Sequence, residues 1–582
     1  MIRAYSRRLF RPFAAMLAVF ALLSLGAPGT PAKAYTPSVS TLRIGLYFGG
    51  STLSSANLQN VDGYGSGFEF GYFDSATRAF ISIGATTGET RLSMIRDMNM
   101  VGFNDPADNN RYAYKQGTTG DVVVGCYHIQ LSGSYSDFGS ANAVAVQYSD
   151  GYVKYDNGVF YACAGAYLSS GDAQTAMANR GLSGTITAGS SYTIAIVVTG
   201  TNKMVFEFDG GANMALGVRP LASNAEKPQT YFKGYRYYGA FQYYRADGQD
   251  LRVLNIVNVE DYVKGLLPYE MSASWPIEAL KAQALCARTY AMSKLGAHGS
   301  AGFDLCVTEH CQVYRGTGAA NATTDRAVDE TAGEYITYDG KLCETYYSSC
   351  DGGATEDVEN VWAYTIPYLR GVIDPYEKDI THRISNYNWT VTYTPAALST
   401  RLQNRGYSIG TVASLSVDTF TNNGNARVVT IKDTNGRSLT LQKENIRLAL
   451  GANSIRLTTG GGTQPGPGAG SGTALYVNSS SNALDNGAAL YAVSAGGTAQ
   501  QLPSGGTVYA ITGTGTTVEV GTGAVQTAGS ADGKVGGVFQ ISGTGKGHNV
   551  GMSQWGACSM AEYHGKTYKE IINFYYTGVT IG

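Results

Sequence analysis

The sequence predicts a multidomain protein of the α+β class that is rich in strands and contains one long helix. Its 582 residues exceed the size of one ordinary domain. The 75 glycines and 42 tyrosines, with only 15% charged residues, are typical of strand-rich domains. One stretch, 277–295, has the apolar spacing of three and four that indicates a helix with a buried face, whereas much of the chain alternates with a period of two.

The first 34 residues have the pattern of a signal peptide. A basic start is followed by the apolar run FAAMLAVFALLSLG and by the small-residue site Ala32-Lys33-Ala34. The run is short for a membrane span. We expect cleavage after Ala34, export, and no membrane span in the mature chain; the alternative is an uncleaved N-terminal anchor.

The charge of the mature chain disfavours nucleic acid as a partner. Five basic residues and no acid precede residue 35, so cleavage changes the formal net charge from −2 to −7. A weakly acidic exported protein has no bulk positive charge with which to bind an anionic polymer.

Residues 35–120 alternate apolar and polar positions between glycines, which predicts short strands and hairpins. Within 121–185, the stretch YHIQLSGSYSDFGSANAVA is echoed by FYACAGAYLSSGDAQTAMA, each a strand, a turn and an Ala-rich helix. This pattern resembles the SPOR family, whose βαββαβ module binds peptidoglycan strands without peptides. An unrelated ferredoxin-like sandwich is the alternative.

The largest continuous block is 200–458, and its first part is predicted to be strands, including LRVLNIVNVEDYVKG at 251–265. A Gly/Pro linker follows at 459–473. Residues 474–535, rich in Thr, Gly and Val, are expected to form a small all-β insertion. Residues 536–582 are expected to complete the domain that begins at 200.

The most informative stretch is GLLPYEMSASWPIEALKAQALCARTYAMSKLG, at 265–296. Pro276 suits the start of a helix, and Gly296 its end. Lys281 and Arg288 are seven residues apart and are expected to project from one stripe away from the core. Glu270 is expected in a short loop among apolar neighbours, where burial raises a carboxyl pKa and suits a general acid.

This stretch closely resembles the SpoIID/LytB family of cell-wall proteins, in its Glu-Met, Trp-Pro, Glu-Ala-Leu-Lys-Ala-Gln-Ala and Ala-Arg-Thr-Tyr motifs. The resemblance continues in CQVYRG, in ETYYSSCDGGATEDVENVW, in IPYLRGV and in the last 47 residues, so it covers about half the chain. Where family members often have Tyr-His-Ser, this chain has Tyr346-Tyr347-Ser348, which puts any contact made by that His in doubt.

The resemblance implies a lytic transglycosylase acting on peptidoglycan glycan strands, with Glu270 as the catalytic acid and base. We expect Lys281, Gln283 and Arg288 to contact the glycan and Ser348 and Ser349 to line the groove. The alternative for Lys281 and Arg288 is a solvated helix face. The nucleophile is the 6-hydroxyl of N-acetylmuramic acid (MurNAc), so one carboxyl suffices, unlike in two-carboxylate glycosidases. The LytB side of the family implies an alternative, a non-catalytic protein that binds peptidoglycan and activates a separate cell-wall amidase.

A candidate metal site lies in HGSAGFDLCVTEHCQVYRG. Some relatives bind zinc through one His and two Cys in this region, and His298, Cys306 and Cys311 match that order, with His310 or solvent as the fourth ligand. Such a zinc is expected to be structural. The alternatives are a disulfide between Cys306 and Cys311, as in many exported proteins, and two buried thiols without a bond.

The segment GTGKGHNVGMSQWGACSMA, at 543–561, lacks the glycine and Lys-Ser/Thr pattern of phosphate loops. It resembles the C-terminal signature of the SpoIID/LytB family, with Asn549 in place of a glycine; Asn tolerates positive φ better than other side chains. We expect the segment to fold back beside Glu270, with His548, Ser553 and Gln554 facing the glycan. The alternative is a glycine turn that only packs a tryptophan.

Overall fold

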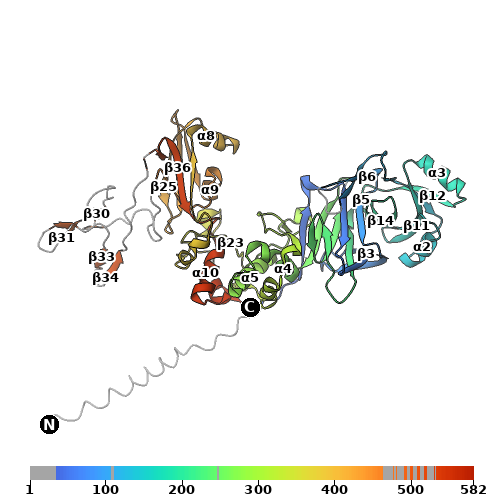
Figure 1. Cartoon of the computed structure of the whole chain (residues 1–582), viewed down its shortest axis with the longest axis horizontal. Coiled ribbons are helices and arrows are strands. Elements are labelled where there is room, and N and C mark those ends of the chain that lie inside the picture. Colours follow the sequence, from blue (N-terminus) through green and yellow to red (C-terminus); the bar gives the residue numbers. More distant parts are fainter. Residues whose placement is uncertain are drawn as a thin grey trace, which may run out of the picture.

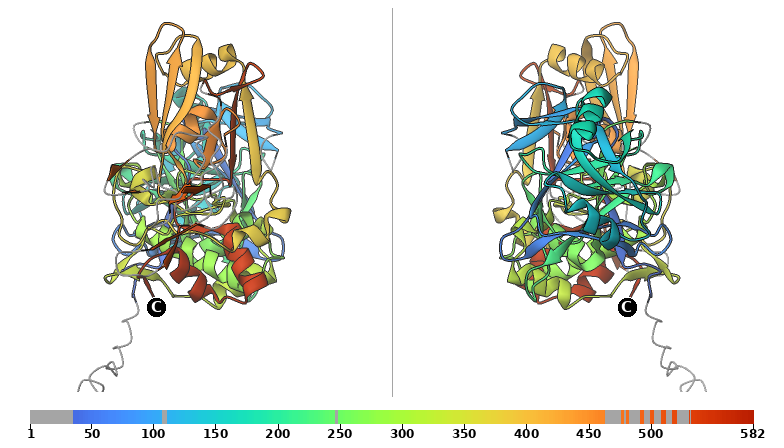
Figure 2. Two further views of the ribbon diagram at one scale, coloured as in Figure 1. Left: turned by 90° about the vertical axis from the view of Figure 1, so that its left-hand side faces the viewer. Right: turned by 90° about the vertical axis from the view of Figure 1, so that its right-hand side faces the viewer.

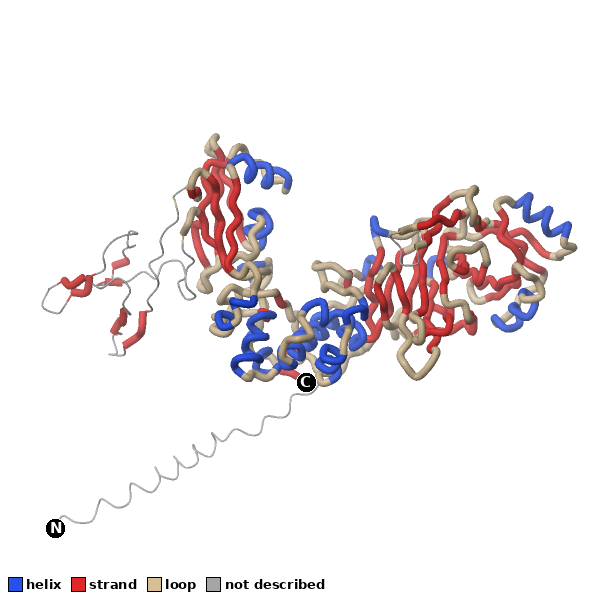
Figure 3. Tube along the Cα trace, viewed as in Figure 1, coloured by secondary structure: helices blue, strands red, loops and turns tan. Residues whose placement is uncertain are grey.

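The computed structural model describes residues 35–106, 111–245, 248–462, 530 and 532–582, together with short strands between 476 and 520. The chain is elongated: a large β part, a central group of helices and a smaller α+β part follow one another along its length (Figures 1 and 3). The predicted strand-rich α+β class is confirmed, since the described residues form ten α-helices and several sheets.

Two of the predicted segments fall mainly outside the described residues. They are the signal peptide, 1–34, and most of the linker, 459–473. Within 474–535, the described strands form antiparallel pairs: β29 (Tyr476–Val477) with β30 (Ser480–Ser481), β31 (Tyr491–Val493) with β32 (Ala499–Gln501), and β33 (Val508–Ile511) with β34 (Thr517–Val520).

A seven-stranded sheet forms the side of the β part that faces the helices. Its strand order is β20-β1-β19-β18-β15-β3-β4. The bounds are β1 Thr41–Tyr47, β3 Gly65–Phe73, β4 Phe80–Thr87, β15 Leu216–Ala222, β18 Ala240–Tyr244, β19 Arg252–Asn258 and β20 Leu305–Cys306.

A second sheet of ten strands packs behind it, in the order β12-β9-β11-β10-β14-β13-β5-β2-β16-β17. The bounds are β2 Ser55–Asn60, β5 Arg91–Arg96, β9 Tyr127–Leu131, β10 Gly151–Asp156, β11 Val159–Tyr167, β12 Gly184–Ala188, β13 Ile194–Val198, β14 Met204–Asp209, β16 Thr230–Phe232 and β17 Tyr235–Tyr237. A small sheet of β6 (Met100–Asn104), β7 (Tyr112–Gln116) and β8 (Val123–Val124) lies beside it.

Residues 121–185 follow a βαββαβ order, with helix α2 (Phe138–Ala145) after β9 and helix α3 (Ser170–Asn179) after β11. Their four strands are neighbours, but the sheet does not end with them, because β10 pairs in parallel with β14. The repeat is therefore one end of a larger sheet. Its predicted glycan binding stays a prediction.

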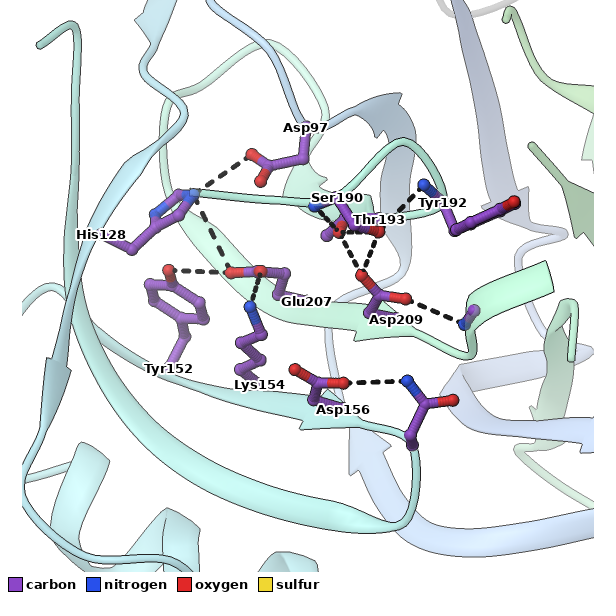
Figure 4. A network of polar contacts seen from close by, with 12 residues as sticks. Asp97, His128, Tyr152, Lys154, Asp156, Ser190, Tyr192, Thr193, Glu207 and Asp209 are labelled. Carbon is purple, nitrogen blue, oxygen red and sulfur yellow. Dashed lines mark hydrogen bonds and ion pairs between the residues drawn. The ribbon is translucent and has the colours of Figure 1, made fainter. Parts of the chain in front are cut away.

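A buried polar network holds this sheet together (Figure 4). His128 Nε2 lies 3.1 Å from Asp97 Oδ1 and 3.8 Å from Glu207 Oε2, and Lys154 Nζ lies 3.0 Å from Glu207 Oε1. Burial alone lowers the pKa of His128, but the charges of Glu207 and Asp97 outweigh it and raise the pKa to about 9. Two cations therefore balance two buried carboxylates, which explains how a buried sheet core tolerates them.

The central helices surround α5 (Ile277–Ser293), the predicted long helix, which begins directly after Pro276. It packs against α4 (Val259–Glu270), α6 (Ala322–Asp329), α10 (Gln554–His564) and α11 (Tyr568–Tyr575). Figure 2 shows α10 and α11 in red beside the green α5, although 260 residues separate α5 from α10 in the chain. Because neighbours cover α5 on all sides, its 13 residues from Ala279 to Met292 other than Lys281 are buried, so the prediction of a single buried face was wrong.

The predicted strand at 251–265 is correct only from Arg252 to Asn258, and helix α4 begins at the next residue. The Asn258 side chain accepts a hydrogen bond from the backbone N–H of Glu260, an N-cap, and Glu260 and Asp261 occupy the first turn, where the helix dipole favours acids. Tyr262, Val263, Leu266 and Leu267 then form its buried side.

The smaller part of the chain has its own apolar core, which includes Trp389, Leu415 and Ile541. In one sheet β36 (Val538–Thr544) lies between β24 (Asn388–Tyr393) and β28 (Leu457–Thr459). A second sheet contains β25 (Val412–Phe420), β26 (Ala426–Asp433) and β27 (Ser438–Gln442), flanked by α8 (Pro395–Asn404) and α9 (Glu444–Leu450). Among the described helices, none is both long and apolar enough to span a membrane.

Candidate functional site

A groove of about 520 Å³ lies where the central helices meet the smaller α+β part. Several chain segments far apart in sequence line it. They include Glu270, Glu309 to Val313, Tyr346 to Ser349, Trp362, Lys546 to His548 and Gln554. Pockets of this size with converging polar groups are the usual binding sites of enzymes.

Glu270 is the last residue of helix α4, so the prediction that it lies in a loop was wrong. Pro268 lies inside the last turn, where its missing N–H removes one helical hydrogen bond without ending the helix. The helix continues for two more residues and holds the Glu270 backbone at the groove. A rigid element fixes a carboxyl more accurately than a loop does.

Two side chains donate hydrogen bonds to the Glu270 carboxylate. Gln554 Nε2, from the start of α10 and 284 residues away in sequence, lies 3.0 Å from Glu270 Oε2. Tyr347 donates the second bond. Its hydroxyl also accepts a hydrogen bond of 3.1 Å from Gln312 Nε2. The C-terminal segment thus folds back beside Glu270.

Burial raises the pKa of Glu270 above its usual value, while the hydrogen bonds from Gln554 and Tyr347 lower it in part, and the charge of Glu309 adds to the rise. A carboxyl with a raised pKa keeps its proton closer to neutral pH. That property suits a general acid which must later act as a base.

Tyr347 was not predicted as a site residue, because the sequence suggested only that a family histidine was missing. It begins the short strand β23 (Tyr347–Ser348), which pairs with β37 (Met552–Ser553) and so aligns the Tyr-Tyr-Ser motif with the C-terminal segment. The sequence signal was its position in that motif. Nothing local to Tyr347 showed that Glu270 is its partner.

The groove is also lined by His548, which lies beside two aromatic rings that contact each other. Its ring lies 5.1 Å from that of Trp362 and 6.4 Å from that of Tyr346, centroid to centroid. Burial, and the charge of Arg447, lower the pKa of His548 to about 4, so the imidazole is neutral near pH 7. Its Nδ1 accepts the backbone N–H of Val550 at 3.1 Å, and its other nitrogen carries the N–H, which is bonded to the Tyr347 backbone.

Asn549 adopts the positive φ that its position requires, 62°, and is fully buried. Its side chain donates to the Asp351 carbonyl at 3.0 Å, and its own carbonyl accepts from the Glu356 N–H at 2.7 Å. The turn beside His548 therefore survives the exchange of Gly for Asn.

The other residues that we predicted to contact the glycan occupy three kinds of position in the structure. Ser348 and Ser349 line the groove. Gln283 is buried and accepts from Gln554 Nε2 at 3.4 Å, so it positions Gln554. Ser553 is fully buried, and its hydroxyl caps α10 and donates to Glu377 Oε1 at 2.7 Å; its predicted glycan contact does not fit this position.

Glu377 belongs to a buried group of carboxyls beneath the groove, with Asp351 and Asp374. It accepts the backbone N–H groups of Asp351 and Gly352, both at 2.8 Å. Burial, and the charges of Glu377 and Asp374, raise the pKa of Asp351 well above its usual value, so this group retains a proton. The cluster ties the Ser-Ser-Cys-Asp turn to the start of α10.

Lys281 and Arg288 are engaged elsewhere in the described structure, so the predicted stripe of glycan contacts does not fit. Arg288 is fully buried and pairs with Glu260, with Nη2 2.6 Å from Oε2. Lys281 pairs with Glu278 at 2.9 Å and Glu330 at 2.7 Å. The reason is that α5 lies at the centre of the helices, where its polar side chains meet other helices.

His298, Cys306, His310 and Cys311 bring one ligand atom each to within 4.8 Å of one another. His298 Nε2 lies 3.3 Å from Cys311 Sγ, and His310 Nδ1 lies 3.5 Å from Cys311 Sγ and 3.8 Å from Cys306 Sγ. Ligand atoms about 2.0–2.3 Å from one tetrahedral zinc are separated by roughly 3.3–3.8 Å. Both cysteines are free thiols in the structure. The donor set and its spacing therefore fit zinc, with His310 as the fourth ligand.

Comparisons with known proteins give a family and several relatives. The family described as "Stage II sporulation protein" matches residues 247–338. An "uncharacterized protein" of Brachyspira hyodysenteriae is 32% identical over 349 residues, which cover 60% of this chain and 73% of the relative.

Two relatives in Bacillus subtilis carry functional names. The "amidase enhancer" is 30% identical over 321 residues, covering 55% of this chain and 40% of the relative. "Stage II sporulation protein D" is 32% identical over 214 residues, covering 34% of this chain and 59% of the relative. The chain thus spans less than two thirds of each of these two proteins.

Proposed function

Since this chain belongs to the SpoIID/LytB family, we propose that it is an exported lytic transglycosylase. It cleaves the bond between MurNAc and N-acetylglucosamine in peptide-free glycan strands and leaves 1,6-anhydroMurNAc ends. The observation that carries the proposal is Glu270, a carboxyl with a raised pKa on a rigid helix end, with two hydrogen-bond donors, in a groove.

The chemistry requires one carboxyl that changes its protonation state twice. Protonated Glu270 donates its proton to the glycosidic oxygen as the bond to MurNAc C1 breaks. The resulting carboxylate, stabilised by Gln554 and Tyr347, takes the proton of the MurNAc 6-hydroxyl, whose oxygen closes the ring on C1. The proton balance is restored and no water is consumed.

His548 is a neutral group in the lining, and its ring N–H is already bonded to the Tyr347 backbone. Trp362 and Tyr346 beside it offer apolar ring faces to the sugar. Ser348 and Ser349 add hydroxyl groups to the groove.

The experiment that tests this function is product analysis. Peptide-free glycan is digested with the full mature chain, and the ends are identified by mass spectrometry. We expect 1,6-anhydroMurNAc ends. Reducing MurNAc ends would show a hydrolase instead, and the absence of any product would reject the enzyme.

A second candidate function is activation of a cell-wall amidase, and the similarity to a protein named amidase enhancer favours it. It predicts that the protein stimulates an amidase on intact peptidoglycan without forming new glycan ends. Mixing the two and measuring the release of peptides separates the candidates, because the transglycosylase forms anhydro ends in the absence of any amidase.

Residues 121–185 are proposed to hold the enzyme on glycan, and export is proposed to place it in the cell wall. Zinc at His298, Cys306, His310 and Cys311 is proposed to be structural. When bound, zinc crosslinks the segment 298–311, part of which lines the groove.

We expect about one zinc ion per chain, and we expect Cys311→Ser to reduce it to near zero and to lower the melting temperature. Metal content is measured by inductively coupled plasma mass spectrometry. Cys126→Ser, a half-buried cysteine outside the cluster, is the matched control and should keep its zinc. A metal-free native protein with a peptide crosslinked through Cys306 and Cys311 would establish the disulfide instead.

Replacing Gln554 is expected to shift the pH dependence of the reaction. Glu270 must be protonated to act as the acid, so kcat/KM falls as pH rises through its pKa. Gln554→Leu removes a donor that stabilises the carboxylate, so the pKa rises further and the alkaline limb moves to higher pH. Tyr347→Phe should move it in the same direction. If the alkaline limb of the kcat/KM profile stays in place or moves to lower pH in both variants, the result would contradict the role of Glu270 as the acid.

A further inference from the structure

A second cavity, of about 790 Å³, lies on one face of the seven-stranded sheet and shares no lining residue with the groove. Side chains two apart on a strand share a face, which brings Arg252, Leu254 and Ile256 of β19 into the same cavity. Tyr244 of β18 lies opposite Arg252, and Arg43 of β1 lies opposite Ile256. The cavity is therefore built on the regular sheet and is of the size that holds a ligand.

The lining of this cavity is positively charged, with three arginines and one aspartate. Arg78 is already neutralised, because its guanidinium forms two bonds of 2.6 and 2.9 Å with the buried Asp304. The aspartate, Asp74, accepts its hydrogen bonds from its own turn, at Ala76 and Thr77. Asp74 keeps its negative charge, so Arg43 and Arg252 leave the lining with one net positive charge.

The Nε atoms of both arginines are buried and have no hydrogen-bond partner in the described part of the chain, so contacts with a ligand fall to their Nη groups. The nearest carboxylate to Arg43 is that of Asp304, at 3.9 Å, and Arg252 uses Nη1 for the Ala301 carbonyl at 2.6 Å. A guanidinium can donate two parallel hydrogen bonds to the two oxygens of a carboxylate. The ligand that suits these arginines is therefore a carboxylate.

The rest of the lining suits a sugar. Tyr72, Phe73 and Tyr244 are half-buried and offer ring faces, and Gln242 offers an amide. The Cα atoms of Arg43 and Arg252 are separated by four residues in register, roughly 13 Å along the strands. That spacing leaves room for a disaccharide unit between the two charges.

One chain segment joins this cavity to the groove. Gly299 to Gly302 line the cavity, and Glu309 to Val313 line the groove. The four proposed zinc ligands lie in and beside this segment, at 298, 306, 310 and 311. Phe303 to Leu305, between the two sets of lining residues, are fully buried, so the segment links the two sites through the core.

We propose that this cavity is a second glycan subsite, which binds a sugar with a free carboxylate. In peptidoglycan that sugar is MurNAc after its peptide has been removed, because the lactyl group then ends in a carboxylate, whereas with the peptide attached it is a neutral amide. The subsite therefore selects peptide-free strands. This inference rests on the proposed function for the identity of the polymer, which is peptidoglycan glycan. The recognition of the carboxylate by the cavity is tested separately.

The test measures the binding of peptide-free glycan oligomers by calorimetry, with Glu270→Gln to prevent turnover. Arg43→Gln in this background is expected to weaken binding about ten-fold or more, as the loss of a charge-assisted hydrogen bond does. Arg219→Gln, which removes an exposed arginine from strand β15 of the same sheet, is the matched control and should bind normally. Carboxyl-reduced glycan should bind to the Glu270→Gln protein as weakly as native glycan binds to the double variant Glu270→Gln, Arg43→Gln.

The outcomes separate the subsite from the proposed function. Equal binding of native and carboxyl-reduced glycan, or unchanged binding by Arg43→Gln, overturns the subsite even if wild-type protein forms anhydro ends. Arg43-dependent binding without any glycan cleavage supports the subsite and rejects the enzyme. Tighter binding of a wall polymer that carries phosphate, in competition with the glycan, overturns the choice of a carboxylated sugar. In the protein that keeps Glu270, Arg43→Gln should raise KM on long strands by about ten-fold. This kinetic measurement checks the binding result independently.

Discussion

Glu270→Gln is expected to reduce the formation of 1,6-anhydroMurNAc ends by roughly 10²- to 10⁴-fold, the usual contribution of a general acid or base. Glutamine has the same shape as glutamate but cannot release or accept the proton. The amide oxygen of the substituted side chain can still accept the hydrogen bond from Gln554, so the groove should keep its form and its affinity for glycan.

The matched control is Glu309→Gln, at the exposed rim of the same groove. It removes one negative charge that helps to raise the pKa of Glu270, so it should lower that pKa slightly and leave most of the activity. Turnover is measured as anhydro ends per minute, and binding by glycan pull-down. Full turnover by Glu270→Gln would reject it as the acid, and full amidase stimulation by the same variant would favour the activator.

Arg288→Ala is expected to destabilise the central helices by roughly 3–5 kcal/mol, the cost of breaking a buried ion pair from one side. Arg288 is fully buried, with Nε 2.9 Å from Glu260 Oε1, Nη2 3.1 Å from the Val328 carbonyl and Nη1 3.3 Å from Thr331 Oγ1. Its loss leaves these partners of α4 and α6 without their shared cation.

Lys281→Ala, on the same helix, is the matched control. Its ion pairs are made with partly exposed glutamates, and such pairs contribute at most about 1 kcal/mol. Melting temperatures compare the two variants, and glycan pull-down is measured below the transition. An Arg288→Ala protein with normal stability and weakened glycan binding would support the prediction from the sequence that Arg288 contacts the glycan.

The parts of the fold set by local sequence could be predicted. Pro276 marks the start of α5, and Gly565, with a φ of 61°, follows the end of α10. The βαββαβ order of 121–185 followed from its repeated strand-turn-helix pattern. In each case a few neighbouring residues determine the backbone.

What could not be predicted depends on partners far away in the chain. Arg288 has the spacing of an exposed helix residue, and only the packing of α4 and α6 around α5 makes it a buried one. The hydrogen bond from Gln554 to Glu270 spans 284 residues, and no periodicity indicates such a contact. Helix α4 was missed because the alternation of Val257 and Val259 continues past its Asn258 cap.

The position of the insertion in the smaller α+β part has a consequence for how such chains diversify. β28 and β36 are antiparallel neighbours, and Thr459 lies directly opposite Ile541. Ser530 also donates its backbone N–H to the Gly460 carbonyl at 2.8 Å. The chain therefore leaves and re-enters at adjacent points of one sheet edge, where the entropy of closing a loop depends only weakly on its length. Duplication or exchange of whole modules at this point requires no rearrangement of the residues around Glu270, so the insertion can change without disturbing the groove.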